Sequence, residues 1–320
     1  MTMLVATYEI TGTSAKLYDL EFVRTHYNIY PWIADGNYLC RVLRLPSSGI
    51  PYLARVNRSA RGLRVQLYGE RPLRCNDEKI LRELLVFCMG LDSDYRLLEA
   101  AAVNDRVLAT ALEVNKGIRP KRYSDIFEAV CGAICAQNVN FRRLYQMMEL
   151  LAKRFGPSLD VFGQPYFGFP VPTEVANKSV TELHECKVGY RADRILRAAL
   201  WFVTDPSAKA MTPTTLRAMD AQAALQKVCE IPGIGPYSAA IVLSAGAGRQ
   251  DIFHLDSFTR HILRQFYFAG QAVPDEELQQ FVASKWPGIG GLVAHVLTTN
   301  TEIWAARLGC EGFRRSGARL

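Results

Sequence analysis

An α+β fold is predicted for this chain of 320 residues, with a small antiparallel sheet first and helices over the remainder. Within residues 1–70, apolar side chains alternate with polar ones, as at Leu63, Val65 and Leu67, which is the period of a half-buried strand. From residue 77 onward the apolar positions recur with the spacing of a helix. The hydrophobic content of 49% is enough for a substantial buried core.

We expect three parts. Residues 1–80 form the sheet module, with strands at 38–45, 51–58 and 63–67 separated by turns at 46–49 and 59–62. Residues 81–122 and 252–320 form one helical lobe, and residues 123–251 form a second lobe, with the functional cleft between them. The sheet module contains no cluster of catalytic residue types.

Helical segments are predicted through residue 116, over 123–136, over 141–155 up to Gly156, and over 187–203. The basic segment 117–122 contains a proline and is predicted to be a solvated linker, and residues after Gly156 to be a loop rich in Phe, Pro and Gly. The polar break at residues 137–140 has two interpretations, an ordinary turn or a loop that holds side chains out for binding.

The net charge of +7 and the pI near 9.0 favour an acidic partner such as nucleic acid, although the excess of basic residues is modest. The eight cysteines are scattered, which is typical of reduced thiols in a cytosolic protein. Cys131 and Cys135 have helical spacing, but no nearby ligand set completes a metal site. Because no apolar run approaches the length of a membrane helix, we expect a soluble, cytoplasmic monomer, associated with the nucleoid if bacterial.

The most informative stretch is residues 225–264, where two glycines and an acid interrupt three helical segments. Gly233 and Gly235 allow a tight turn and close approach of a ligand to the backbone. The helix that starts near Pro236 directs free N–H groups and the positive end of its dipole at that turn, which predicts a phosphate site. Asp256 follows at the start of the next helix, where it serves either as a cap or as a functional acid.

This stretch resembles the helix-hairpin-helix, Gly/Pro and aspartate signature of base-excision DNA glycosylases, with the hairpin at about residues 220–246. It is most similar to the branch that contains 3-methyladenine glycosylase II and 8-oxoguanine glycosylase. The resemblance extends to residues 123–156, to Gly189, Tyr190 and Arg191, and to the terminal helices. It implies that duplex DNA with a damaged base is the partner, and that the backbone amides of Gly233, Gly235 and Tyr237 hold its phosphate.

By this resemblance Asp256 matches the catalytic aspartate, which is chemically reasonable. Breaking an N-glycosidic bond creates positive charge on the sugar, which a fixed carboxylate stabilises. A position at a helix start favours the ionised carboxylate. Asp251 is the rival acid, less favoured because it lies within the preceding loop.

Members of the family that also cleave the strand carry a lysine directly after the hairpin. Tyr237 stands there, 19 residues before Asp256, and Lys227 lies on the wrong side of the turn to replace that lysine. A phenol forms no Schiff base, so hydrolysis without strand cleavage is expected. Tyr237 instead offers an aromatic face to a flipped base, with Trp304 and Trp286 as further candidates for the base pocket, and plain core packing is the alternative for Tyr237.

The resemblance also implies that Asn138, beside Gln137 and Asn140, fills the gap that the flipped base leaves. An asparagine here is typical of the 8-oxoguanine branch, whereas the tyrosine at position 237 favours alkylated purines. No cofactor is expected, since four closely spaced carboxy-terminal cysteines are lacking for an iron–sulfur cluster; the resemblance allows a monovalent cation at the hairpin carbonyls. Oxidised-purine excision, a non-catalytic DNA-binding protein and a basic protein that does not engage DNA remain alternatives.

The sequence Pro-Gly-Ile-Gly occurs a second time, at residues 287–290 after Trp286. No aspartate occurs beyond Asp275, so this second turn lacks the acid that follows the first one. We interpret it as a junction between two helices.

Overall fold

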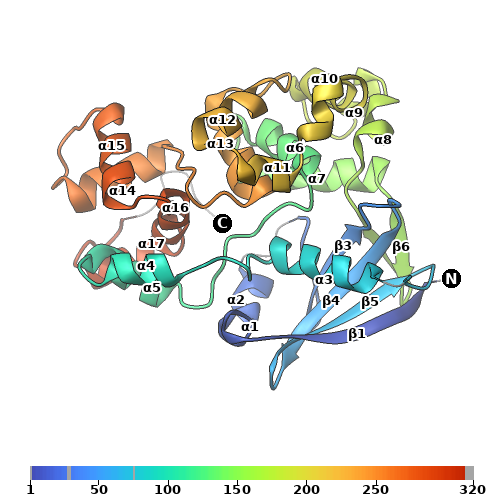
Figure 1. Ribbon diagram of the computed structural model, residues 1–320, viewed down its shortest axis with the longest axis horizontal. Helices are drawn as coiled ribbons and strands as arrows, with labels where there is room; N and C mark the ends of the chain where they lie inside the picture. The colour runs from blue at the N-terminus through green and yellow to red at the C-terminus, as the bar shows by residue number, and fades with distance from the viewer. Residues whose placement is uncertain (1, 27–29, 75, 314–320) are drawn as a thin grey trace.

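The computed structural model describes residues 2–26, 30–74 and 76–313, so that Cys75 lies outside the described part. Figure 1 shows the amino-terminal sheet at one corner, a group of helices above it, and a second group beside both. The α+β fold is therefore confirmed, and the described residues form four clusters of buried side chains. No described helix has both the length and the apolarity needed to span a bilayer.

The sheet is antiparallel throughout, in the order β1-β5-β4-β3-β2. Its strands are β1 (Met3–Thr11), β2 (Ile33–Asp35), β3 (Tyr38–Arg44), β4 (Pro51–Ser59) and β5 (Gly62–Gly69). The short turns after β3 and β4 place successive strands side by side, as the sequence predicts.

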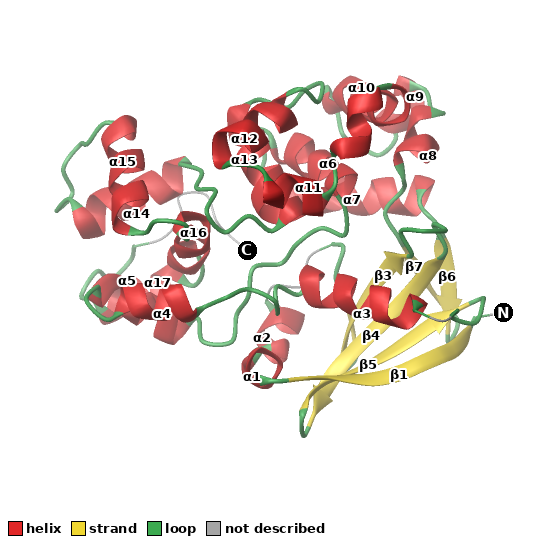
Figure 2. Cartoon of the chain, viewed as in Figure 1, coloured by secondary structure: helices red, strands yellow, loops and turns green. Residues whose placement is uncertain are grey.

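Both faces of the sheet are covered, which explains why β3 and β4 are buried along most of their length. One face packs on α1 (Thr13–Leu17), α2 (Leu20–Thr25) and α3 (Asp77–Cys88), seen with the sheet in Figure 2. Leu81 and Leu85 of α3 belong to this core. The sheet module therefore extends to α3, beyond the boundary expected at residue 80, because the apolar stripe of α3 faces the sheet.

The other face of the sheet is covered by a hairpin formed by β6 (Ser158–Val161) and β7 (Gln164–Phe167). Leu159, Val161 and Tyr166 fill the cluster between them, and the Tyr166 hydroxyl donates to Asp35 Oδ2 at 2.7 Å. The expectation of a plain loop after Gly156 is wrong in this part. The alternating burial of these short strands is created by the sheet against which they pack.

The helical lobe above the sheet surrounds α6 (Ile126–Ala136), which is buried nearly all round. Its residues 126–135 pack in one cluster with side chains from throughout the lobe, down to Ile252. The other elements are α7 (Phe141–Phe155), α8 (Pro172–Ala176), α9 (Val180–His184), α10 (Arg191–Thr204), η1 (Pro206–Ala210), α11 (Pro213–Ala218), α12 (Ala221–Cys229), α13 (Pro236–Val242) and the π-helical turn η2 (Leu243–Ala247).

The second helical lobe combines segments far apart in the chain. Its core joins residues 95–111 to residues 258–313 and is rich in aromatic rings. Its elements are α4 (Arg96–Ala102), α5 (Arg106–Val114), α14 (Ser257–Tyr267), α15 (Asp275–Lys285), α16 (Gly290–Thr298) and α17 (Thr301–Arg307).

Segment 117–122, which was expected to be solvated, is largely buried, and that expectation is wrong. Arg119 and Arg122 are 6% and 5% exposed, and Arg122 Nη1 lies 2.5 Å from Asp92 Oδ1. The Arg122 carbonyl accepts from Arg41 Nη1 at 2.8 Å, and Arg41 Nη2 lies 2.9 Å from Glu128 Oε2. The basic residues are buried because each has a carbonyl, carboxylate or aromatic partner where the three parts meet.

Candidate active site

The hairpin between α12 and α13 has the geometry that its glycines predict. Gly233 has φ 87°, in the left-handed region, and Gly235 is the extended residue that precedes α13. Gly233, Gly235 and Tyr237 are exposed at the turn. A Cβ on Gly235 would meet no atom within 4 Å, so the space beside this residue is open.

The break at residues 137–140 lies against this hairpin. The Gln137 side-chain amide donates to the Gly233 carbonyl at 3.3 Å, and its Oε1 accepts a hydrogen bond from Arg194 of α10. Arg191 donates to the Gln137 carbonyl. Two turns that are 96 residues apart in the chain thus form one surface, stabilised by arginines of a third segment.

Asn138 is exposed on this surface with φ 54°, a conformation that asparagine tolerates better than most residues. Asn140 caps α7 by accepting from the Arg143 backbone N–H at 2.9 Å. Tyr190 is 52% exposed beside Arg191 and Arg194, whose guanidinium groups lie 4.4 and 5.1 Å from its ring. An exposed polar residue, an aromatic ring and basic groups therefore occur together at the hairpin.

Arg194 was not singled out from the sequence, although a signal was present. Arg191 and Arg194 are three residues apart in α10 and therefore share a face. The sequence does not show that this face meets the hairpin, where a Cβ on Gly233 would lie 3.3 Å from Arg194 Cβ.

Asp256 is the N-cap of α14. Its Oδ1 accepts hydrogen bonds from the Thr259 backbone N–H at 2.6 Å and from the Thr259 hydroxyl at 2.7 Å. Thr259 is only 2% exposed, while Asp256 is half-buried. The carboxylate is thereby held in one orientation at the positive end of a helix, which stabilises its charged form.

The loop before Asp256 is bound to both helical lobes. Arg249 donates to the carbonyls of Leu216 and Met219 at 2.9 and 2.8 Å, and the Gln250 carbonyl accepts from the backbone N–H groups of Gly291 and Leu292 at 2.9 and 3.2 Å. The second Pro-Gly-Ile-Gly turn therefore supports this loop. The turn itself connects α15 to α16, as predicted.

Asp251 and Lys227 are both engaged in local ion pairs. The Asp251 carboxylate accepts from Arg249 Nε at 2.7 Å and from Nη2 at 2.5 Å. Burial alone would raise the pKa of Asp251, but the hydrogen bonds and charge of Arg249 bring it below its ordinary value. Lys227 Nζ lies 2.6 Å from Glu230 Oε2, on the α12 side of the turn. Both pairs are structural contacts within their own segments.

Tyr237 is 50% exposed in the first turn of α13, so its ring is not packed in the core. Trp286 and Trp304 are placed differently, at 2% and 0% exposure within the core of the second helical lobe. The Trp304 indole donates to the Leu297 carbonyl at 3.1 Å. The structure does not bring these two tryptophans to the surface with Tyr237, because their apolar rings complete the lobe core.

Cys131 and Cys135 are fully buried in α6, and burial raises the pKa of the Cys135 thiol to about 12. Two hairpin carbonyls already accept hydrogen bonds, Ile231 O from the Ile234 N–H at 3.1 Å and Gly233 O from Gln137. The monovalent cation allowed by the resemblance would have to share such carbonyls, and it remains a prediction.

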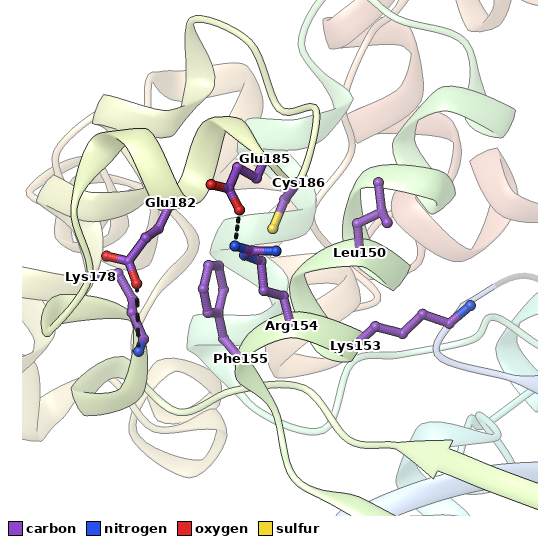
Figure 3. A pocket seen from close by; sticks show the side chains of 8 residues that line it. All are labelled: Leu150, Lys153, Arg154, Phe155, Lys178, Glu182, Glu185 and Cys186. Carbon is purple, nitrogen blue, oxygen red and sulfur yellow. Dashed lines mark ion pairs between the residues drawn. The ribbon is translucent and has the colours of Figure 1, made fainter.

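A cavity of about 570 Å³ lies away from these residues, at the carboxyl end of α7, roughly 20 Å along the helix from the 137–140 turn. Figure 3 shows Arg154 directed at Glu185, and Lys178 directed at Glu182 along one wall. Its walls contain none of the predicted site residues, and these charges neutralise one another. The chemistry is therefore assigned to the hairpin surface.

An exposed glycine hairpin, followed by an acid fixed at the next helix start on a two-lobed helical scaffold with a sheet module, defines a DNA glycosylase of the helix-hairpin-helix class. A family model described as HhH-GPD superfamily base excision DNA repair protein matches residues 131–288, which include the hairpin and Asp256. The chain belongs to the HhH-GPD superfamily of base excision DNA repair proteins.

Known proteins of two activities are similar to this chain. A probable N-glycosylase/DNA lyase of Methanothermobacter thermautotrophicus is 26% identical over 261 residues, covering 74% of this chain and 78% of that protein. DNA-3-methyladenine glycosylase of Bacillus subtilis is 25% identical over 153 residues, covering 48% of this chain and 50% of that protein.

The structure of MBOgg1 in complex with a low-affinity DNA ligand matches with a TM-score of 0.72 at 20% identity. The match covers 96% of this chain and 100% of that chain. At this identity the likeness shows that the two chains share a fold, and the matched part includes the sheet module.

Proposed function

We propose that this protein is a monofunctional DNA glycosylase that hydrolyses the N-glycosidic bond of damaged purines in duplex DNA, with alkylated purines favoured. The observation that carries the proposal is the exposed phenol of Tyr237 at the position after the hairpin, together with Asp256 fixed at the start of α14. Membership of the superfamily supports base excision in general, and these two residues support hydrolysis of the bond to a damaged purine without strand cleavage.

The first step is binding of the DNA backbone at the hairpin. The N–H groups at the start of α13 supply hydrogen bonds and partial positive charge for a phosphate. The basic residues of α10 and α7 add a positive field, and contacts to phosphate position the protein without reading sequence.

The second step is rotation of the damaged nucleotide out of the stack, which the chemistry requires because the bond is inaccessible within the duplex. In our proposal the exposed Asn138 enters the vacated space, with Gln137 supporting it through its contacts to the hairpin and Arg194. Tyr190, exposed on the same surface, is available to stack on a neighbouring base.

The third step is cleavage of the bond to the base. Positive charge develops on the sugar, and the carboxylate of Asp256 stabilises it and directs a water molecule to the anomeric carbon. The base stacks on Tyr237, and a cationic alkylated purine gains additional attraction to the aromatic face. Since a phenol forms no imine, the products are a free base and an intact strand with an abasic site.

Excision of oxidised purines is the second candidate. Asn138 favours it, because an asparagine at this position resembles the 8-oxoguanine branch, and the side chain is exposed at the hairpin surface. The relative described as a probable N-glycosylase/DNA lyase agrees with this alternative. Base release from matched duplexes with an alkylated, oxidised or deaminated purine would decide between the two.

The decisive experiment compares Asp256→Asn with Asp220→Asn. Both aspartates are N-caps, Asp220 accepting from the Ala223 N–H at 2.9 Å, and asparagine preserves a cap. We expect Asp256→Asn to lose at least about 100-fold in the rate of base release while binding DNA normally, because the charge that stabilises the sugar is removed. Asp220→Asn should retain full activity, and equal activity of both variants would contradict the catalytic assignment.

Borohydride reduction tests the absence of strand cleavage. The wild-type protein should give no covalent adduct with damaged DNA, since Tyr237 cannot form an imine. A trapped adduct would show that another amine takes part. Absence of base release from every lesion, combined with salt-dependent duplex binding, would instead indicate a non-catalytic DNA-binding protein.

A further inference from the structure

The two segments that carry the proposed chemistry meet through a pair of rings. Tyr237 comes from the hairpin helix α13, and His254 comes from the loop that leads to Asp256. Their ring centroids are 5.7 Å apart and their planes meet at 82°, a T-shaped arrangement. This is a favoured geometry for aromatic pairs, because the positive edge of one ring faces the negative face of the other.

The support beneath His254 is rigid. Ile252, two residues earlier, is 3% exposed in the core of the lobe that contains the hairpin. The Gln250 carbonyl accepts two backbone hydrogen bonds from the start of α16, and Asp256, two residues after His254, caps α14. An imidazole between two such anchors has little freedom to move with the exposed ring beside it.

Tyr237, in contrast, is 50% exposed in the first turn of α13. An exposed ring that rotates freely loses rotamer entropy whenever a base stacks on it. Contact with a fixed imidazole restricts that rotation before the base arrives. The ring is then pre-organised, which raises the affinity for a stacked base without adding a contact to it.

We propose that His254 is a positioning residue for base selection: its imidazole holds Tyr237 in the orientation in which the phenol ring stacks on a flipped purine. The inference rests on the proposed function, in which Tyr237 receives the base. His254 acts through Tyr237, and Asp256 remains the group that attends to the sugar. Purines, with their two fused rings, depend on this orientation more than smaller bases do.

The test uses His254→Ala, which removes the ring contact, and His254→Phe, which retains it. For purine lesions we expect kcat/KM to fall about 3- to 10-fold in His254→Ala and to recover in His254→Phe, consistent with the usual strength of an aromatic pair. Affinity for duplex with a tetrahydrofuran abasic site should stay within about twofold of wild type, because such a site presents no base to stack.

A matched control is His26→Ala, since His26 also stacks on an aromatic ring, Phe22, at 5.2 Å, but within the sheet module. This variant should behave as wild type in every assay. If His254→Ala retains wild-type kcat/KM, or if His254→Phe fails to restore it, the inference is wrong. An equal loss of abasic-site affinity in His254→Ala would also overturn it, because that result indicates general damage to the site.

A second readout separates this inference from the proposed function. A duplex with 2-aminopurine at the flipped position fluoresces less when the probe stacks on tyrosine. The complex with His254→Ala should be brighter than the wild-type and His254→Phe complexes, and equal brightness would refute the role of His254. If the wild-type protein releases no base from any lesion, the proposed function fails, while this fluorescence comparison still decides whether His254 orients Tyr237.

Discussion

Gly291→Ala is expected to displace the loop that delivers Asp256, and its effect follows from the structure. A Cβ on Gly291 would lie 2.3 Å from the Ile252 carbonyl oxygen and 3.0 Å from that of Gln250. Ordinary contact begins near 3.4 Å, so the loop or the start of α16 must move by about 1 Å. Both obstacles are backbone atoms, which have no rotamer to change.

A displacement of about 1 Å at a catalytic group costs up to about 100-fold in rate. Ile252 precedes Asp256 by four residues, and the Thr259 contacts resist part of the movement. We therefore expect kcat for base release to fall by roughly 10- to 100-fold. Overpacking of this kind costs about 1–3 kcal/mol of stability, so the melting temperature should also fall by several degrees.

The assay is single-turnover base release, well below the melting temperature, together with the Kd for abasic-site duplex. Gly290→Ala is the matched control, because its clash is shallower: its Cβ would lie 3.0 Å from Val282 Cγ1, which can change rotamer, and 3.3 Å from Phe253 Cβ in the same loop. The control should retain most of its activity. Wild-type kcat in Gly291→Ala, or a loss of DNA affinity as large as the loss of rate, would refute the reasoning that α16 positions Asp256.

Two further predictions concern DNA binding and pH. Arg194→Ala removes a charged hydrogen bond to Gln137, so we expect the Kd for damaged duplex to rise about tenfold. Arg197→Ala is the control and should change the Kd little, because the exposed Arg197 guanidinium pairs with Asp193 at 2.6 Å. Equal Kd values for the two variants, measured by fluorescence anisotropy, would contradict the link between the two turns. Burial, together with the charges of Arg119 and Arg122, lowers the pKa of His295 to about 4 from 6.5, so stability from this group is present above pH 6.5 and is lost as the pH falls toward 4. Denaturant unfolding at pH 7.5 and pH 5 should show a drop about 2 kcal/mol larger in wild type than in His295→Gln, and equal drops would contradict this assignment.

Much of the fold could be predicted because its signals are local. Strand β5 alternates in polarity and short turns separate it from β4 and β4 from β3, while α7 begins at a capping Asn140 and ends at Gly156. The hairpin β6–β7 carried no such signal. Its strands of four residues are stabilised by the sheet that they cover, and that contact is long-range.

Burial was the less predictable property. The basic segment 117–122 is polar enough to be solvated, and only its carbonyl, carboxylate and aromatic partners make it an interior segment. Trp286 and Trp304 were plausible pocket residues by type, but burial in the lobe core removes them from the surface. A residue type predicts what a side chain can contact, whereas packing decides what it does contact.

What the sequence by itself determined is the character of one contiguous stretch: a glycine turn suited to phosphate, a tyrosine at the position where strand-cleaving members of the family it resembles carry a lysine, and Asp256 at the next helix start. These features depend on backbone conformation and on spacing within one segment. Only the tertiary structure decided that Gln137 and Arg194 meet the hairpin, that Gly291 supports the loop before Asp256, and that His254 lies against Tyr237. The reason is physical: these contacts join residues through the close packing of separate segments, where a fraction of an ångström decides which groups touch.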